Sequence, residues 1–415
     1  MKLNSKQAAV AAALTLLAGA AQPAWADAET DKLKTEIEQL KREMRELRSV
    51  LERQKQDTAT KQDVQEVRDE VSQAKKAGGS GLLANNSLVH LAGYGHVGYA
   101  NRRGMNSSFG EVGFNPIFHY QYKDLLLFET ELEIMSNAEG EAEFGLEYAN
   151  MNVFANDYLT AFGGKFLSPI GYFIQNLHPA WINKFPSKPP GFEEEGGAVP
   201  VSDIGAGIKG GVPFGSGMKA NYTLYVGNGP RLELSGAGDE IESIAATGGT
   251  TNPSKHKLVG GRLGFLPIPN LELGLSAAHS RVAVAPEGAP VEASRNYSVV
   301  GADFGWRWRG LDLRGEYMRS RVGDLDTSVA PLGGTWKTHY VQAAYRIPGT
   351  KWEPVLRYGK FTSPHADQDL KQLGLGVDYW FESDIVGKLA YERNDGEPGT
   401  PNDANRVLLQ FAFGF

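Results

Sequence analysis

The chain has 415 residues, including 50 Gly, 16 Tyr and no Cys, and carries a formal net charge of −7. The absence of Cys excludes a disulfide framework and thiolate chemistry, and the acidic balance gives no support for nucleic-acid binding. The hydrophobic content of 41% is low for a membrane protein built of helices, and every apolar stretch is too short for a membrane-spanning helix.

Residues 1–26 are predicted to be a signal peptide. Lys2 and Lys6 form a short positive region, residues 8–21 are apolar and rich in Ala and Leu, and residues 24–26 form a small-x-small cleavage site. A membrane anchor would need a longer apolar run without such a site. We therefore expect export, with the mature chain beginning at Asp27.

Residues 27–77 have the pattern of an α-helical coiled coil. Apolar residues recur at alternating spacings of four and three, with Lys, Arg and Glu between them; they are Leu33, Ile37, Leu40, Met44, Leu47 and Leu51. A helix of this length extends about 75 Å and buries its apolar stripe by self-association. A helix lying against the rim of the following domain is the alternative. Residues 78–87, rich in Gly and Ser, are predicted to be a flexible linker.

From residue 88 to residue 415 the apolar period changes to two, which indicates β-strands. Strand starts are predicted near Val89, Glu111, Leu125, Glu143, Leu159, Ile204, Lys219, Lys257, Leu271, Tyr297, Leu311, Trp336, Trp352, Lys371, Ile385 and Arg406. An even number is typical of single-chain bacterial barrels. The predicted fold class is therefore all-β, an antiparallel transmembrane β-barrel of about 16 strands, preceded by the N-terminal coiled coil.

The connections between these strands alternate in length. Every second one is short, as at Lys123-Asp124, Asn156-Asp157 and Arg309-Gly310. Most of the others are long and polar, as in residues 230–255, 285–295, 324–334 and 395–405. Short turns at one end and long loops at the other are the pattern of outer-membrane barrels. This pattern places both ends of the barrel domain on the short-turn, periplasmic side.

Apolar and polar residues alternate within the strands, and we expect the apolar set to face lipid and the polar set to face a wet lumen. The last strand shows the alternation most clearly, with Val407, Leu409, Phe411, Phe413 and Phe415. This ending resembles the terminal strand of Gram-negative outer-membrane proteins, whose assembly machinery reads a final aromatic residue. The resemblance implies location in the outer membrane, in contact with lipid and lipopolysaccharide.

The longest connection, residues 171–200, follows the fifth predicted strand and contains several Pro together with Trp181, Phe185 and Phe192. Such an apolar loop would be poorly soluble in water, and folding into the barrel would bury it. Sixteen-stranded outer-membrane porins fold a loop inward at this ordinal position to narrow the pore. We therefore predict a constriction loop; a lid or a trimer contact is the alternative.

The stretch from Gly164 to Pro190, GKFLSPIGYF followed by LHPAWINKFPSKPP, resembles a segment of porins of the phosphate-selective type. Several of those porins also carry an N-terminal coiled coil. The resemblance implies a porin, and porin barrels of this size are usually homotrimers. No arginine ladder or lysine cluster is recognisable in this chain, so phosphate or anion selectivity is not implied.

Charged residues predicted to face the pore are of both signs. In the loop they are Lys184, Lys188, Glu193, Glu194 and Glu195. On the strands the basic candidates are Lys165, Lys209, Lys219, Arg262, Arg307, Arg314, Arg346, Arg357 and Lys388, and the acidic ones are Glu129, Glu131, Glu133, Glu143, Glu147, Glu316 and Glu392. Acids gather on the third and fourth strands and bases on later ones, which predicts a transverse field. Plain solvation and interstrand pairing are the alternative.

No catalytic or cofactor-binding motif is found, and we expect no enzyme. The chain has 8 His, and His90 and His96 are six apart with no carboxylate partner between them, so no metal site is predicted. The predicted function is a porin that forms a water-filled channel for passive diffusion of small hydrophilic solutes or ions. A structural tether, joining the outer membrane to the cell wall or a periplasmic partner through the coil, is the alternative. A barrel enzyme of the lipase kind is a third interpretation.

Overall fold

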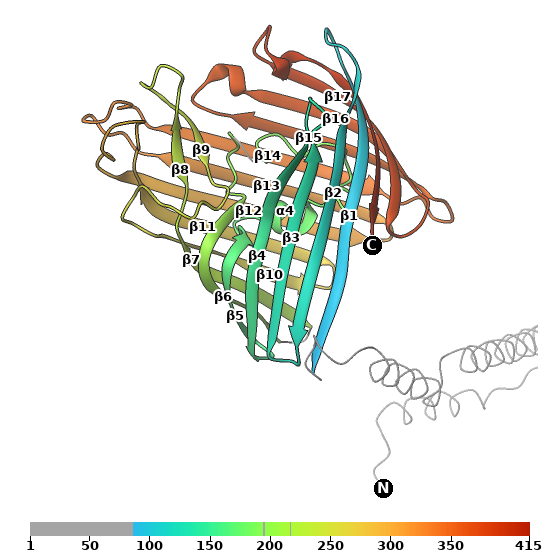
Figure 1. Ribbon diagram of the computed structural model, residues 1–415. Helices are drawn as coiled ribbons and strands as arrows, with labels where there is room; N and C mark the ends of the chain where they lie inside the picture. Colours follow the sequence, from blue (N-terminus) through green and yellow to red (C-terminus); the bar gives the residue numbers. More distant parts are fainter. Residues whose placement is uncertain (1–85, 194–195, 216) are drawn as a thin grey trace, which may run out of the picture. The chain divides into compact units, whose positions relative to one another are not determined.

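The computed structural model describes residues 86–193, 196–215 and 217–415, so the predicted signal peptide and coiled coil lie outside the described residues. The described residues, from 86 onward, belong to one compact unit. Within this unit the chain is folded into a closed antiparallel barrel of 16 strands (Figure 1).

The barrel strands begin close to the predicted positions. They are β1 Ser87–Arg102, β2 Ser108–Tyr122, β3 Leu126–Ser136, β4 Ala142–Asn156, β5 Leu159–Leu167, β6 Ser202–Phe214, β7 Met218–Gly227, β10 Leu258–Ile268, β11 Leu271–Val282, β12 Arg295–Trp308, β13 Leu311–Val322, β14 Gly334–Tyr345, β15 Trp352–Thr362, β16 Leu370–Trp380, β17 Ile385–Gly396 and β18 Arg406–Gly414. Every predicted start lies within three residues of the observed one. The prediction of a barrel of about 16 strands is confirmed.

Strand β1 closes the barrel by pairing with both β2 and β18. The β1–β18 ladder runs from Tyr94 opposite Gly414 to Arg102 opposite Arg406. Beyond it, the amide N of Gly93 and the carbonyl O of Phe415 lie 3.0 Å apart. Closure leaves no unpaired barrel edge, so every barrel strand has a partner on each side.

The short turns have the backbone geometry of tight β-hairpins. In the turn between β12 and β13, Arg309 has φ 46° and Gly310 has φ 86°. Two positive φ values match the right-handed twist of the flanking strands, and Gly adopts them without steric cost. The long loops also carry elements that the alternation pattern did not predict: the hairpin of β8 (Arg231–Leu234) and β9 (Ile241–Ala245) and the 3₁₀ turns Ala366–Gln368 and Pro401–Asp403.

Burial alternates along the strands as a barrel requires. On β15, Glu353 and Arg357 are buried on the inner face, whereas Trp352 and Leu356 are 48% and 47% exposed on the outer face. Outer faces elsewhere are also apolar, for example at Leu275, which is 68% exposed. A belt of exposed apolar side chains is the surface that lipid requires.

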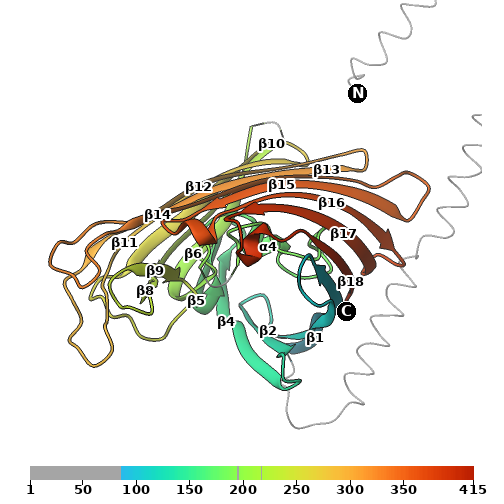
Figure 2. The same cartoon turned by 90° about the horizontal axis from the view of Figure 1, so that it is seen from above.

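The hydrophobic core lies inside the barrel. Residues 168–201, between β5 and β6, run through the interior and include the short helix α4 (Phe173–Leu177), which Figure 2 shows within the ring of strands. Ile170, Phe173 and Phe192 of this segment form one cluster with inward apolar side chains that include Trp336 and Tyr340. Over the part of the chain that is described, no helix combines the length and apolarity needed to span a membrane.

Candidate functional site

The interior segment, residues 168–201, begins and ends at one point of the barrel wall. The amide of Ser168 donates to the carbonyl of Val201 at 2.8 Å, so the chain leaves β5 and returns to β6 side by side. Between these two residues the segment contacts the inner faces of several strands on the far wall. The wall therefore fixes the path of the segment at points that are distant in sequence.

Glu316 of β13 holds the start of α4. Its carboxylate accepts the amides of Tyr172 at 3.2 Å and Phe173 at 3.0 Å, and the amide of Gly171 donates to Ser276 Oγ of β11 at 2.9 Å. The first amides of a helix have no partner within the helix, and a carboxylate satisfies them well. Gly171 has φ +86° and lies against Glu316, so a larger residue there would be strained.

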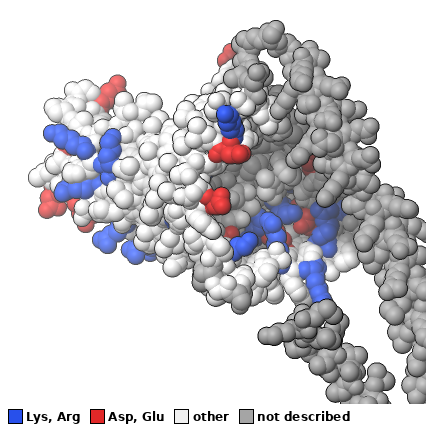
Figure 3. Space-filling view, turned by 90° about the horizontal axis from the view of Figure 1, so that it is seen from below, with Lys and Arg blue, Asp and Glu red and all other residues white. Residues whose placement is uncertain are grey.

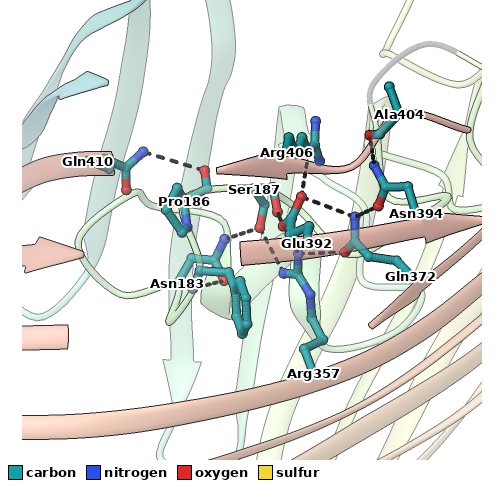
Figure 4. Close-up of polar contacts among 11 residues, drawn as sticks. Asn183, Pro186, Ser187, Arg357, Gln372, Glu392, Asn394, Ala404, Arg406 and Gln410 are labelled. Carbon is teal, nitrogen blue, oxygen red and sulfur yellow. Dashed lines mark hydrogen bonds and ion pairs between the residues drawn. The ribbon is translucent and has the colours of Figure 1, made fainter. Parts of the chain in front are cut away.

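A second attachment surrounds Ser187 (Figure 4). Arg357 of β15 donates to the Ser187 carbonyl at 2.8 Å and to the Gln372 side chain at 3.0 Å. Its guanidinium also lies 3.1 Å from Glu392 of β17, and neither side chain of this ion pair is exposed. Glu392 additionally accepts hydrogen bonds from Ser187 and from Arg406. These hydrogen bonds satisfy most polar atoms of the buried charge pair, although Nε of Arg357 has no partner among the described residues.

A third attachment joins residues 180–184 to β15 and β17. The ammonium of Lys388 donates to the carbonyls of Ala180 and Asn183, the latter at 2.6 Å. Lys184 pairs with Glu353 at 3.0 Å and lies 4.9 Å from the centre of the Trp380 ring. Its side chain is only 13% exposed. Lys184 thus binds the wall instead of edging the aperture as predicted, because a buried carboxylate is available to it there.

Aromatic side chains of the segment fill the space between these attachments. Phe185 is fully buried and lies against Gly374, where an added Cβ would come within 2.6 Å of its ring. Phe173 and Phe192 pack edge to face with each other and with Tyr340, at centroid distances of 5.3 to 6.0 Å. Each such burial contributes about 1.5–3 kcal/mol. The far wall therefore holds the segment by apolar packing as well as by polar contacts.

Cavities remain between the segment and the opposite wall, and residues of the segment line each of them. One of about 400 Å³ is lined by Glu111, Glu133 and Glu147 of β2–β4 and by Lys188 and Arg406. A second, of about 300 Å³, shares His178 with the first and is lined by Glu129, Glu131 and Lys209. A third, of about 340 Å³, shares Lys209 with the second and reaches Arg262 and Glu272. The shared residues show that the three cavities adjoin one another in series inside the barrel.

Acidic side chains dominate one side of these cavities. Glu131 is 1% exposed and accepts hydrogen bonds from Tyr94 at 2.7 Å and Asn115 at 3.4 Å. Glu193 of the segment is accessible from the first cavity, yet the surrounding wall displaces much of its hydration, and this desolvation raises the pKa of its carboxyl. Acids thus line the cavities from both the wall and the segment.

The basic side chains are mostly neutralised by neighbours. Arg262 lies 2.5 Å from Asp303 and 2.9 Å from Glu272, and Arg314 lies 2.5 Å from Asp312. Arg307, which is 65% exposed near the short turn, lies 3.3 Å from the same Asp312. Figure 3 shows basic and acidic side chains next to one another around a hollow of the barrel surface.

Lys209 differs from the other cavity-lining bases. Its ammonium lies 5.6 Å from the centre of the Phe162 ring, and it forms no hydrogen bond or ion pair with any residue that the structure describes. It therefore offers a cation to the cavity solvent.

Two predicted pore charges do not meet the pore solvent, and two others fall on residues that the structure does not describe. Lys165 is on the outer face of β5, where its ammonium donates to the Leu146 carbonyl at 2.6 Å; the residues on either side of it, Gly164 and Phe166, face inward. Arg357 faces inward as predicted, but the segment covers it completely and it does not meet the pore solvent. Glu194 and Glu195 fall on residues that the structure does not describe.

Several cavity-lining residues were not among the predicted sites. Glu111 was predicted only as a strand start, although its alternation with Val112 placed it on a polar face. His178 lies in the interior segment, which has no period from which an orientation can be read. Within residues 86–193, 196–215 and 217–415, no group of three or more His, Cys, Asp or Glu forms a metal-binding cluster.

Comparisons with known proteins identify the fold. No family model matches the chain, and no curated protein matches it. A loop-deletion mutant of OmpT, an outer membrane protein of Vibrio cholerae, is 14% identical with a TM-score of 0.53, over 80% of this chain and 100% of that one. The outer membrane channel DcaP of Acinetobacter baumannii is 10% identical with a TM-score of 0.53, over 81% and 100%. An anion-selective porin from Comamonas acidovorans is 15% identical with a TM-score of 0.52, over 79% and 100%.

The barrel therefore has the fold of outer-membrane porins and channels. At such low sequence identity the comparisons establish the fold of this chain, but they do not establish that it shares the selectivity of those proteins. The likeness of residues 164–190 to the phosphate-selective type, and the coiled coil, stay predictions.

Proposed function

We propose that the protein is an outer-membrane porin, a water-filled channel for passive diffusion of small hydrophilic solutes or ions. The observation that carries this proposal is the asymmetric position of residues 168–201. Its polar attachments include hydrogen bonds to β11, β13, β15 and β17, and charged, adjoining cavities remain between it and a wall made mostly of β1–β7. A segment that served only to fill the barrel would need no such charged lining, because buried charges without solvent are costly.

The outer face supports a membrane location for this channel. Apolar side chains are exposed over the strands, among them Val259, Leu263 and Leu375 at 62%, 61% and 55%. Such a surface is unfavourable in water and favourable in lipid. We propose that the barrel stands in the outer membrane, in contact with lipid and lipopolysaccharide, as a homotrimer. The trimer is supported by the family resemblance and by a trimer form of OmpT, an outer membrane protein of Vibrio cholerae that has this fold.

We propose that the interior segment sets the pore width and that its charges tune selectivity. Lys188 and Glu193 line the first cavity, opposite the carboxylates of β2–β4. Four glutamates, Glu111, Glu133, Glu147 and Glu193, line the first cavity against two bases, Lys188 and Arg406, so the lining is net negative and its field attracts cations. The wild-type channel should accordingly favour cations over anions, and neutralising Glu193, Glu194 and Glu195 should shift permeability toward anions.

Planar-bilayer recording tests the proposal. The purified protein should conduct in discrete steps, and its reversal potential in a salt gradient should show cation preference. Replacing residues 172–199 with a short Gly-Ser connection is sterically feasible, since Ser168 and Val201 are hydrogen-bonded neighbours, and should raise the single-channel conductance. A folded protein that inserts but does not conduct refutes the channel, and an unchanged conductance after the replacement refutes the constriction.

Glu287→Gln is a matched control for the charge variants. Glu287 is exposed in the long loop between β11 and β12 and lines none of the three cavities. Its neutralisation should leave the reversal potential unchanged, whereas the triple neutralisation of Glu193, Glu194 and Glu195 should move it. Equal shifts in both variants would mean that overall charge, and not the position of these carboxylates, sets the preference.

A further inference from the structure

Two histidines face each other across neighbouring strands on the lumen side of the barrel. His90 of β1 and His119 of β2 are directly paired in the β1–β2 ladder. They stand on the same face as Tyr94 and Ile117, which line the lumen cavities. The two residues are 29 apart in sequence, so only the strand register brings them together.

The two rings point their Nδ1 atoms at one gap. The Nδ1 atoms are 3.5 Å apart, whereas the ring centroids are 5.7 Å apart with an interplanar angle of 27°. The larger centroid separation means that the two nitrogens lie on the facing edges of the rings. A separation of 3.5 Å exceeds a normal hydrogen bond of about 2.7–3.2 Å, so direct hydrogen bonding does not account for this arrangement.

The same separation fits a metal ion between the nitrogens. Imidazole nitrogens bind zinc at about 2.0–2.1 Å, and two ligands of a tetrahedral ion are then about 3.4 Å apart. The observed 3.5 Å matches this distance without movement of the strands. The pairing of the two strands thus holds two nitrogens at the separation that two ligands of a tetrahedral cation require.

A carboxylate stands behind one of the two rings. Glu129 Oε1 of β3 lies 3.5 Å from Nε2 of His119, on the side of the ring away from His90. Asn152 Nδ2 donates to the other carboxylate oxygen at 2.9 Å, which orients Glu129. At this distance the negative carboxylate favours the tautomer with the proton on Nε2, which leaves the lone pair on Nδ1, the nitrogen that faces the gap. Carboxylates commonly play this supporting role behind metal-binding histidines.

The position is accessible from the lumen. The side chains of His119 and Glu129 are each 26% exposed, and His90 is exposed. Glu129 also lines the second cavity of the series, so an ion in the lumen solvent reaches the pair. Two protein nitrogens leave coordination positions for water, which suits an exchangeable ion better than a structural one.

We propose that His90 and His119 bind a divalent transition cation of the zinc or copper class, with Glu129 positioning His119 and water completing the coordination. Imidazole ligands select such borderline cations over Mg²⁺ and Ca²⁺, which prefer oxygen. The bound ion would add positive charge beside the acidic wall and would reduce cation passage through the lumen. Binding itself does not depend on whether the barrel conducts.

Zinc titration calorimetry of the full chain, folded in detergent micelles, tests the proposal. One Zn²⁺ should bind per chain, and MgCl₂ should give no binding heat. His90→Ala and His119→Ala should each weaken zinc binding by at least about tenfold, and Glu129→Gln by about 10- to 100-fold, the usual effect of removing a supporting carboxylate. Circular dichroism and heat-modifiable migration establish that each variant is folded.

His279→Ala is the matched control, because His279 is exposed on the outer face of β11. It should bind zinc as the wild type does. Copper added as an electron-paramagnetic-resonance probe should show coupling to two nitrogens in the wild type and to fewer in either lumen variant. The absence of stoichiometric zinc binding, or wild-type affinity in both His90→Ala and His119→Ala, would overturn the proposal. Bilayer recording without zinc tests the channel separately, so the two proposals fail independently.

Discussion

Replacing Arg357 with Ala should release the middle of the interior segment. The side chain is fully buried, lies 4.2 Å from the centre of the Phe185 ring and donates to Ser187 of the segment. Its loss removes the hydrogen bonds to Ser187 and leaves the buried Glu392 carboxylate with Arg406 as its cationic partner. Breaking a buried pair costs about 3–5 kcal/mol when the remaining charge has no other partner. Because Arg406 still pairs with Glu392, we expect the lower end, about 3 kcal/mol, which corresponds to about a 10²-fold shift toward the released segment.

Limited proteolysis at lysine provides the assay. Lys184 is 13% exposed in the docked segment, so cleavage between residues 184 and 188 should be slow in the wild type and much faster in Arg357→Ala. Bilayer recordings of the variant should show larger and noisier single-channel currents. Arg321→Ala, which removes an exposed guanidinium from β13, is the control and should change neither measurement. If Arg357→Ala keeps both wild-type protease resistance and wild-type conductance, the buried network does not hold the segment.

Three further predictions concern the pore, the packing of the segment and the assembly. Because desolvation raises the pKa of Glu193, acidification should neutralise this carboxylate at a higher pH than an ordinary exposed glutamate. The permeability for cations relative to anions should fall at that pH, and Glu193→Gln should remove this fall from the pH profile. Gly374→Leu should expel the Phe185 ring, since an added Cβ already comes within 2.6 Å of it, and should lower the free energy of unfolding by about 1–3 kcal/mol, the usual cost of overpacking, as measured by urea titration. Native mass measurement in detergent should give a trimer, and retention of the trimer after deletion of residues 27–77 would show that the predicted coil does not drive oligomerisation.

The alternation of apolar and polar residues predicted the barrel because lipid requires apolar side chains on nearly every outer face. Assigning apolar residues to the outer face is wrong where the interior segment provides apolar side chains for inward-facing residues to pack against. Phe162 and Phe166 face inward and pack in one cluster with Ile170 and Phe173, so the intervening Lys165 faces outward although its charge predicted the lumen. A rule that assigns apolar residues to lipid has no means of recognising an apolar surface inside the barrel.

The interior segment itself was predictable in location but not in detail. Its length and aromatic content indicated burial, but a segment without a strand or long helix has no period that orients its side chains. Lys184 and Lys188 are four residues apart; one binds Glu353 and the other lines a cavity. The pairing of His90 with His119 could not be predicted from the sequence for another reason. It depends on the register between β1 and β2, and the spacing of residues within one strand does not determine that register.

The β1–β18 ladder has a consequence for how this chain folds. It pairs Arg102 with Arg406, residues separated by nearly the whole barrel sequence. Contacts between such distant residues form slowly, because the intervening chain must first be ordered. Until β18 arrives, β1 presents an unpaired edge that is able to join strands of other chains. The unfinished barrel must therefore be kept from aggregation while it folds, which makes its yield in the cell depend on chaperones and on the rate of closure.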